Sequence, residues 1–264
     1  MRLFLGGDSH CGSIVGLTPP KWQQNEAQAE QWAAYMAALK RRGPFDIGVW
    51  AGDMIDGKSE RAGGQDVFVN SRREQVLMAQ QVIEAVNAPE NVLAYGTPYH
   101  TGAGEDHEAY LTDIMGDRLH GDDQIFMTCE GVTFNVKHKV GASSIEHGRL
   151  TPLVKDVAWL RAWALEKKQH PKCQVIIRGH VHYHRYAGAM GPDWWLAMTL
   201  PALQGLGSKF GRRQCSATVD WGFCWMDVKE GAIQAWGAEI LTLPSQREKV
   251  LALGKRKRRR KKAV

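Results

Sequence analysis

The first half of the chain alternates short apolar runs with longer amphipathic stretches. Three apolar runs end at glycine and predict buried strands, at residues 2–7, 46–51 and 91–95. Three longer stretches predict helices, because apolar side chains recur in them at three- and four-residue spacing, at residues 22–42, 71–86 and 104–115. Gly43-Pro44 ends the first of these helices.

The second half is dominated by strand-like segments. One helix is expected over residues 151–168, with Thr151 as its cap and Pro152 at its first position. The strand-like segments are residues 125–129, 132–138, 172–178, 194–199, 218–228 and 232–243. Helices that alternate with strands early and strands that prevail late predict an α/β fold, in which two packed mixed β-sheets are flanked by helices. We expect one domain over residues 1–245 and a separate tail over residues 246–264.

The positive charge of the chain is concentrated in that tail. The formal net charge is +6, but eight of the 34 lysines and arginines form one unbroken run. The rest of the chain has 26 basic and 28 acidic side chains, so it is nearly neutral. Such a run predicts a disordered segment that contacts DNA or RNA in a salt-sensitive way. Its residues are Lys255, Arg256, Lys257, Arg258, Arg259, Arg260, Lys261 and Lys262.

Cysteine usage and hydropathy bear on the cellular compartment. The five cysteines are scattered and form no CxxC pair, which favours reduced thiols in a cytoplasm. Cys11 lies beside a candidate metal motif and is assigned to packing rather than to ligation. We expect neither a secretory signal nor a membrane span, because no apolar run is long enough.

Aspartate and histidine follow several predicted strands. Asp8-Ser9-His10 follows the first strand, Gly52-Asp53-Met54-Ile55-Asp56 the second, and His138 ends a hairpin arm. Gly179-His180-Val181-His182 follows a later strand. Because ligands gather at the carboxyl ends of strands in α/β sheets, these side chains are expected to meet. Carboxylate oxygens and imidazole nitrogens together suit Mn, Fe, Zn or similar divalent ions, and two such ions can clamp a phosphate.

This order of motifs resembles the calcineurin-like metallophosphoesterase superfamily, whose motifs are DxH, GDxxD, GNH, a lone His and GHxH. The resemblance covers residues 1 to about 240 and every motif except the third. It implies a four-layer α/β/β/α sandwich and a centre of two divalent ions. Mn²⁺ is favoured, with Fe, Zn, Ni and Mg as alternatives.

The resemblance also implies the ligands of each ion. Asp8, His10, Asp53 and His182 would hold one ion, and Asp53, His138 and His180 the other, with Asp53 bridging. Asp56 is expected to orient a ligand without binding metal itself. In the superfamily, a metal-activated hydroxide attacks phosphorus in line.

The third motif departs from the superfamily pattern. The chain has Gly96-Thr97-Pro98-Tyr99-His100, with Thr97 where an Asn ligand is expected and Pro98 where a His is expected. Either Thr97 binds metal weakly, or water or another group takes that place. His100 is the candidate proton donor to the leaving group, with Tyr99 and His107 as rivals. A similar string occurs in phage-type members of the superfamily, which favours a viral source and the host cytoplasm.

Three functions compete. The leading one is a metal-dependent phosphodiesterase acting on nucleic acid or a nucleotide, because the basic tail favours a polymeric substrate. The second is a phosphomonoesterase or protein phosphatase, and the third is a scaffold that has lost its chemistry. Arg149 and Arg178 are candidate phosphate contacts, with a solvated loop and a strand-end salt bridge as the respective alternatives.

The ten tryptophans raise the question of base stacking. Trp159 and Trp163 lie four residues apart on one predicted helix and are assigned to its core face. The pattern assigns most of the other tryptophans to packing and leaves a few for a substrate groove.

Overall fold

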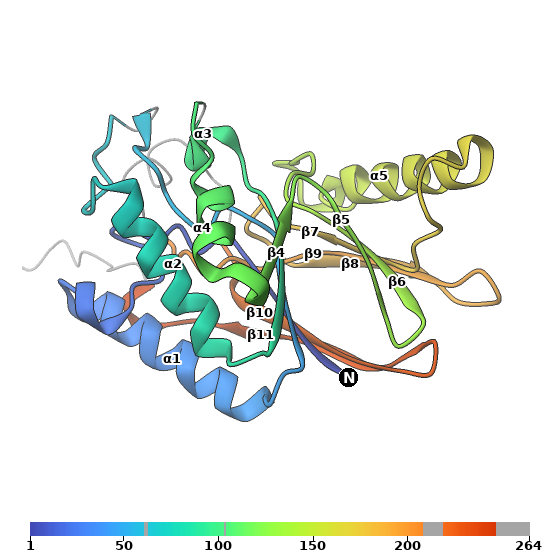
Figure 1. The fold of residues 1–264 in the computed structure, drawn as a ribbon, viewed down its shortest axis with the longest axis horizontal. Coiled ribbons are helices and arrows are strands. Elements are labelled where there is room, and N and C mark those ends of the chain that lie inside the picture. The colour runs from blue at the N-terminus through green and yellow to red at the C-terminus, as the bar shows by residue number, and fades with distance from the viewer. Residues whose placement is uncertain (61–62, 103, 208–218, 247–264) are drawn as a thin grey trace, which may run out of the picture.

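Two β-sheets pack face to face at the centre of the protein, with helices on both outer sides (Figure 1). The computed structural model describes residues 1–60, 63–102, 104–207 and 219–246. The basic tail predicted over residues 246–264, Cys215 and the start of the strand predicted at residue 218 lie outside these ranges, apart from Gln246. The domain boundary at residue 245 therefore stays a prediction.

The first sheet has six strands in the order β11-β10-β1-β2-β3-β4. The four strands β1 to β4 are parallel, and β10 and β11 add to β1 as an antiparallel pair. Their bounds are β1 Arg2–Gly6, β2 Ile47–Trp50, β3 Glu90–Ala94, β4 Leu119–Asp122, β10 Trp221–Lys229 and β11 Ala232–Leu241.

The second sheet has five strands in the order β5-β6-β7-β9-β8. Its three central strands are parallel, and an antiparallel strand closes each edge. Their bounds are β5 Ile125–Cys129, β6 Val132–Lys137, β7 Val175–Arg178, β8 Arg185–Ala189 and β9 Trp195–Thr199. Both sheets are therefore mixed, and the predicted fold class is confirmed.

Helices complete the outer layers (Figure 1). The first sheet is covered by α1 (Glu26–Arg42), α2 (Arg72–Val86) and α4 (His107–Met115), whereas α5 (Thr151–Ala162) packs on the second sheet. The one-turn helix α3 (Pro98–Thr101) follows β3. Short 3₁₀ turns occupy Pro20–Trp22, Gly116–Arg118, Glu146–Gly148 and Pro244–Gln246, and a π-helical turn, Trp163–Lys167, follows α5.

The core is divided into three apolar layers by the alternation of side chains along each strand. On β1, Phe4 packs among the aromatic and aliphatic side chains under the helices. Leu3 and Leu5 point the other way and pack between the two sheets. A smaller cluster, in which Leu153 and Val157 meet the second sheet, fixes α5. Both faces of β1 are thus buried, which explains its unbroken apolar run Leu3-Phe4-Leu5.

Several local predictions are wrong. The first helix begins at Glu26 rather than residue 22, because the Asn25 side chain accepts a hydrogen bond from the Gln28 amide and caps the helix there. Thr151 is the first residue of α5 and does not cap it. Leu150 holds the N-cap position, in αR geometry that continues from the preceding 3₁₀ turn, and it makes no side-chain cap hydrogen bond. The short edge strands β4 and β8 were not predicted.

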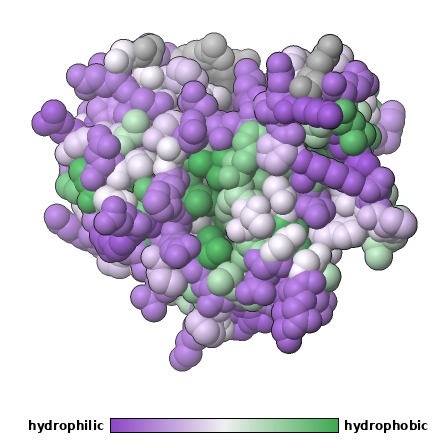
Figure 2. Space-filling model, turned by 45° about the vertical axis from the view of Figure 1, so that its right-hand side comes forward, coloured by the Kyte–Doolittle hydropathy of each residue, from purple (hydrophilic) through white to green (hydrophobic). Residues whose placement is uncertain are grey.

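The two tryptophans assigned to a core face lie largely on the surface. Trp159 is 58% exposed and Trp163 is 40% exposed, because Leu153 and Val157 occupy the side of α5 that faces the sheet. On the face of the molecule shown in Figure 2, hydrophilic side chains cover both flanks and a hydrophobic band runs between them. Within the described residues, none of the helices combines the length and apolar character needed to cross a bilayer.

Candidate metal centre

Strand ends from both sheets bring the predicted aspartates and histidines together. Asp8 and His10 follow β1, Asp53 follows β2, His138 follows β6, and the His180-Val181-His182 turn follows β7. Two backbone hydrogen bonds tie these turns to one another, from the Asp8 amide to the Gly52 carbonyl (2.8 Å) and from the Gly179 amide to the His138 carbonyl (2.9 Å). The candidate centre therefore spans the carboxyl edges of both sheets.

The backbone of these turns is strained. Asp8, His10, Asp53, His180 and His182 all have positive φ angles, between 44° and 73°. This conformation is unfavourable for residues that carry a Cβ, and it persists only where the surrounding structure imposes it. Here it aims five aspartate and histidine side chains into one space. Such clustered strain is typical of functional sites.

One group of potential ligands comprises Asp8, His10 and His182, whose ligand atoms lie within 4.8 Å of one another. Asp8 Oδ1 is 3.2 Å from His182 Nε2 and 3.9 Å from His10 Nε2. The two imidazole nitrogens are 3.2 Å apart. The His180 amide donates to Asp8 Oδ2 at 3.0 Å, which fixes the carboxylate.

A second group comprises Asp53, His138 and His180. Asp53 Oδ2 lies 3.0 Å from His138 Nε2, and that nitrogen lies 3.2 Å from His180 Nδ1. Asp53 also belongs to a third group with His10 and His100, so its carboxylate faces both sides of the centre. This placement is what the bridging role expected of Asp53 requires.

Backbone and carboxyl oxygens hold the outward nitrogens of the imidazoles. His138 Nδ1 lies 2.5 Å from the Ala51 carbonyl, and His100 Nδ1 lies 2.8 Å from the Asp56 carbonyl. A carbonyl oxygen can only accept, so both Nδ1 atoms carry hydrogen and donate, while both Nε2 atoms point at Asp53. His10 Nδ1 similarly lies 3.2 Å from Asp56 Oδ1. Metal-binding histidines are oriented in this way.

Burial and neighbouring charges shift the pKa values of the side chains in the centre. Burial alone would raise the pKa of Asp53, but His138 and His100 hold that pKa well below its ordinary value. Burial alone would lower the pKa of His138, but Asp53 raises it to about 10. Burial, together with His100 and His182, lowers the pKa of His10 well below its ordinary value. His138 therefore carries a proton that metal binding would displace, whereas His10 is neutral. Carboxylate oxygens beside imidazole nitrogens form a donor set that fits divalent ions such as Mn, Fe or Zn.

The third motif contributes to the centre through Asp53. The Thr97 amide donates to Asp53 Oδ1 at 2.7 Å, and the Thr97 hydroxyl lies 3.2 Å from the same oxygen. Thr97 thus orients Asp53, and its own binding of metal stays a prediction. His100 Nε2 is 3.9 Å from Asp53 Oδ2, so His100 lies within the cluster, as expected of a residue that acts there. The one-turn helix α3, which follows Thr97, turns the chain back towards Asp53 and so brings His100 into the cluster.

Glu108 is a residue of the site that the sequence did not reveal. It is fully buried in α4, and its carboxyl accepts hydrogen bonds from the amides of Met54 (2.5 Å) and Gly96 (2.7 Å). These amides adjoin Asp53 and Thr97, so one side chain joins the turns after β2 and β3. Burial, and then the charge of Asp53, raises the pKa of Glu108 to about 8. Glutamate on an amphipathic helix carries no signal of such a role.

The two predicted phosphate-binding arginines are buried. The prediction for Arg178 is wrong, because its guanidinium is fully buried and bonds to Asp156 Oδ2 (2.5 Å) and Asn135 Oδ1 (2.7 Å). The alternative, a strand-end salt bridge, is confirmed. Arg149 is 6% exposed, pairs with Glu146 at 2.6 Å and lies over the Tyr183 ring. Its contact with substrate stays a prediction.

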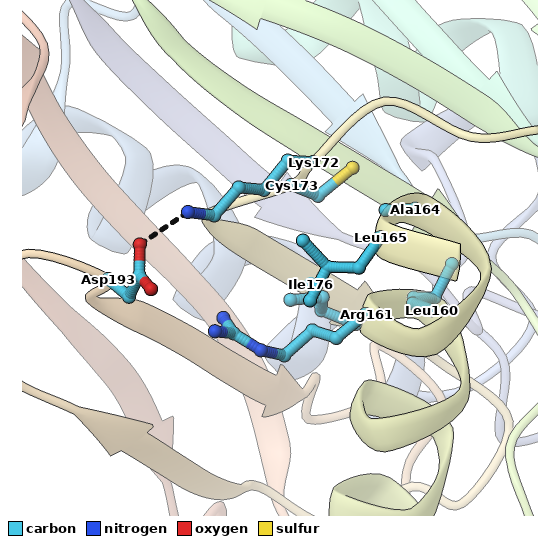
Figure 3. Close-up of a pocket in the computed structure, with 8 residues that line it drawn as sticks. All are labelled: Leu160, Arg161, Ala164, Leu165, Lys172, Cys173, Ile176 and Asp193. Atoms are coloured by element: carbon cyan, nitrogen blue, oxygen red, sulfur yellow. Dashed lines mark hydrogen bonds and ion pairs between the residues drawn. The ribbon is translucent and has the colours of Figure 1, made fainter. Parts of the chain in front are cut away.

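The Cys11 thiol and a small pocket beside Cys173 are not assigned to the metal centre. Cys11 is fully buried, and burial raises the pKa of its thiol to about 12, which agrees with a packing role. A small pocket of about 20 Å³ lies beside Lys172 and Cys173, where the Lys172 ammonium pairs with Asp193 at 2.5 Å (Figure 3). It adjoins the start of β7, whereas His180 follows its end, so this pocket is not part of the centre.

The sequence matches no protein-family model and no curated protein. Similar solved structures include an archaeal phosphodiesterase, at 15% identity over 91% of this chain and 100% of that chain, with a TM-score of 0.47. A purple acid phosphatase from yellow lupin seeds is 10% identical over 86% of this chain and 49% of that chain, with a TM-score of 0.46. A predicted phosphoesterase from Streptococcus pneumoniae is 10% identical over 86% and 83%, with a TM-score of 0.37. At these scores, functional inference must rest on the geometry of the centre.

Proposed function

We propose that the protein is a two-metal phosphodiesterase whose substrate is nucleic acid or a nucleotide. One observation carries the proposal: Asp53 belongs to two of the three ligand groups, and the third group shares His10 with one of these. Two divalent ions held there would polarise a phosphate and lower the pKa of a bound water, which is the chemistry of phosphoester hydrolysis. Mn²⁺ is the favoured ion, with Fe, Zn, Ni and Mg as alternatives.

The residues of the chain have distinct tasks in this proposal. Asp8, His10 and His182 would hold one ion and His138 and His180 the other, and the Asp53 carboxylate would be shared between them. Asp56 and Thr97 orient their neighbours through the hydrogen bonds described above. His100 gives a proton to the leaving oxygen, because its Nδ1 is fixed by the Asp56 carbonyl and its Nε2 points inward.

Diester hydrolysis is favoured over monoester hydrolysis because neither arginine predicted to contact phosphate is an accessible, unpaired cation. A monoesterase commonly needs accessible cations for the extra charge of a terminal phosphate. Arg178 is excluded from this role by its burial, and Arg149 is already paired with Glu146. The basic run at residues 255–262 further favours a polyanionic substrate.

The test compares the hydrolysis of bis-p-nitrophenyl phosphate, a diester, with that of p-nitrophenyl phosphate, a monoester, in Mn²⁺ and in EDTA. We expect faster cleavage of the diester, dependent on Mn²⁺. Faster cleavage of the monoester would favour a phosphatase instead. Absence of activity on both, with two ions bound, would favour the scaffold.

A further inference from the structure

A groove of about 740 Å³ lies between the end of β6 and the first turns of α5. Three lysines line it, Lys137, Lys139 and Lys155, together with the indole of Trp159. Its volume falls in the range of ordinary ligand-binding clefts. None of its lining residues belongs to the metal centre described above.

The groove carries a net positive charge. Among the described residues, no carboxylate lies within ion-pair distance of Lys137, Lys139 or Lys155. The single acidic residue of the lining, Asp156, is already bound to Arg178 at 2.5 Å. Three ammonium groups around one hollow repel one another, and an anion that bridges them would relieve that repulsion.

Trp159 adds an aromatic surface to this charge. It follows Lys155 by four residues on α5, so both side chains lie on the same side of the helix. Its 58% exposure leaves a large apolar ring open to solvent, and no other aromatic ring among the described residues packs against it. Lysine ammonium groups can bind phosphates, and an exposed indole beside them can stack on a base, so together they suit a nucleic acid strand.

The groove begins next to the metal centre. Lys137 and Lys139 flank His138 in the sequence, and the next residue, Val140, lines the groove. Val140 also packs with Val181, which lies between His180 and His182. A polymer lying in the groove would therefore reach the centre at one of its ends.

We propose that this groove binds the single-stranded nucleic acid substrate, with phosphates on the three lysines and one base stacked on Trp159. A single strand is specified because a base inside a duplex has no free face to offer the indole. This inference rests on the proposed function, since it names the substrate class of the same centre. It assigns the contact to the folded domain rather than to the basic tail alone.

The experiment measures the binding of a fluorescein-labelled oligonucleotide of about 12 nucleotides to the full chain by anisotropy, in EDTA to prevent turnover. Titrations between about 50 and 200 mM salt give the salt slope. The combined substitution Lys137→Ala, Lys139→Ala and Lys155→Ala should reduce the slope by about 2, because each phosphate contact on a single strand contributes about 0.7. The control removes three lysines elsewhere, by Lys40→Ala, Lys172→Ala and Lys229→Ala, and should leave the slope unchanged.

The stacking contact has its own pair of variants. Trp159→Ala should weaken binding about tenfold, and Trp159→Phe should restore part of the loss, because phenylalanine keeps a stacking face. Trp163→Ala is the matched control: Trp163 is the next exposed tryptophan along the chain and does not line the groove. Circular dichroism on every variant excludes loss of the fold as the cause.

The result has clear alternatives. The inference is overturned if the salt slope of the triple-lysine groove variant is unchanged, or if the lysine control variant loses as much slope. It is also overturned if Trp159→Ala and Trp163→Ala weaken binding equally, or if duplex binds as tightly as the single strand. Hydrolysis of bis-p-nitrophenyl phosphate by the unmodified chain is measured in parallel. If that hydrolysis occurs while the groove variants bind normally, only the groove is excluded. If binding depends on the groove but no hydrolysis occurs, only the proposed function fails.

Discussion

Replacement of Glu108 tests whether the turns after β2 and β3 are held by one buried carboxyl. Glu108→Ala removes the acceptor of the Met54 and Gly96 amides. An unsatisfied buried donor costs about 1–3 kcal/mol, and the Gly96 amide, which is only partly buried, costs less than the Met54 amide. We therefore expect the free energy of unfolding to fall by about 2–5 kcal/mol.

Glu108→Gln is the isosteric comparison. Its amide keeps one oxygen as an acceptor but turns an NH₂ group towards the other backbone donor, so a loss of about 1–3 kcal/mol is expected. Glu105→Ala, at an exposed residue close by in the sequence, serves as the control and should be neutral. Urea unfolding in EDTA measures all three variants. A loss below about 1 kcal/mol for Glu108→Ala would refute the reasoning, as would equal losses for Ala and Gln.

The pH dependence of the same variant gives an independent check. Because the pKa of Glu108 is raised to about 8 in the fold, the folded protein binds this proton more tightly than the unfolded chain does. The resulting stabilisation is complete below the unfolded pKa of about 4.5 and is lost as pH rises through about 8. Glu108→Gln has no such proton. Its deficit relative to the unmodified protein should therefore shrink between pH 5 and pH 9, and a constant deficit would contradict the assignment.

Four further predictions concern the centre and the tail. His100→Gln should lower turnover of a diester with a poor leaving group far more than that of a p-nitrophenyl ester, which needs no proton; equal losses would exclude proton donation. Metal-free protein should lose thermal stability as pH rises from about 6.5 to 10, because the raised pKa of His138 favours the folded state only while that proton is bound, and Mn²⁺ should flatten the curve. Thr97→Val should weaken metal binding about tenfold, measured by calorimetry, through loss of the hydroxyl contact to Asp53. Deletion of residues 255–264 should reduce the salt slope for single-stranded DNA by about 6 if all eight charges contact phosphate; an unchanged slope would remove the tail from the account.

The sequence predicts the parts of the fold that depend on apolar periodicity. Leu3, Phe4 and Leu5 form an unbroken apolar run because both faces of β1 are buried. Glycine after such a run, followed by Asp or His, was enough to place Asp8, Asp53 and His180 at one edge. The positive φ angles of these three residues were not foreseeable, because they are imposed by hydrogen bonds between turns that are distant in the sequence.

Features that depend on tertiary partners were missed or misassigned. β4 and β8 are edge strands, which need little apolar content, so Leu119–Asp122 and Arg185–Ala189 showed no strand pattern. The burial of Arg178 depends on Asp156, which arrives on α5. Trp159 and Trp163 lie four residues apart, which predicts a shared helix side, but the sheet packs against the side of α5 that carries Leu153 and Val157.

The central claim is that this centre holds two ions bridged by Asp53. The most direct test is the number of Mn²⁺ ions bound per chain, measured by equilibrium dialysis and elemental analysis, for the unmodified protein and for Asp53→Asn. The account predicts two ions for the unmodified protein and a loss of affinity for both in the variant, because the carboxylate faces both groups of ligands. Two fully bound ions in Asp53→Asn, or a single ion in the unmodified protein, would contradict it.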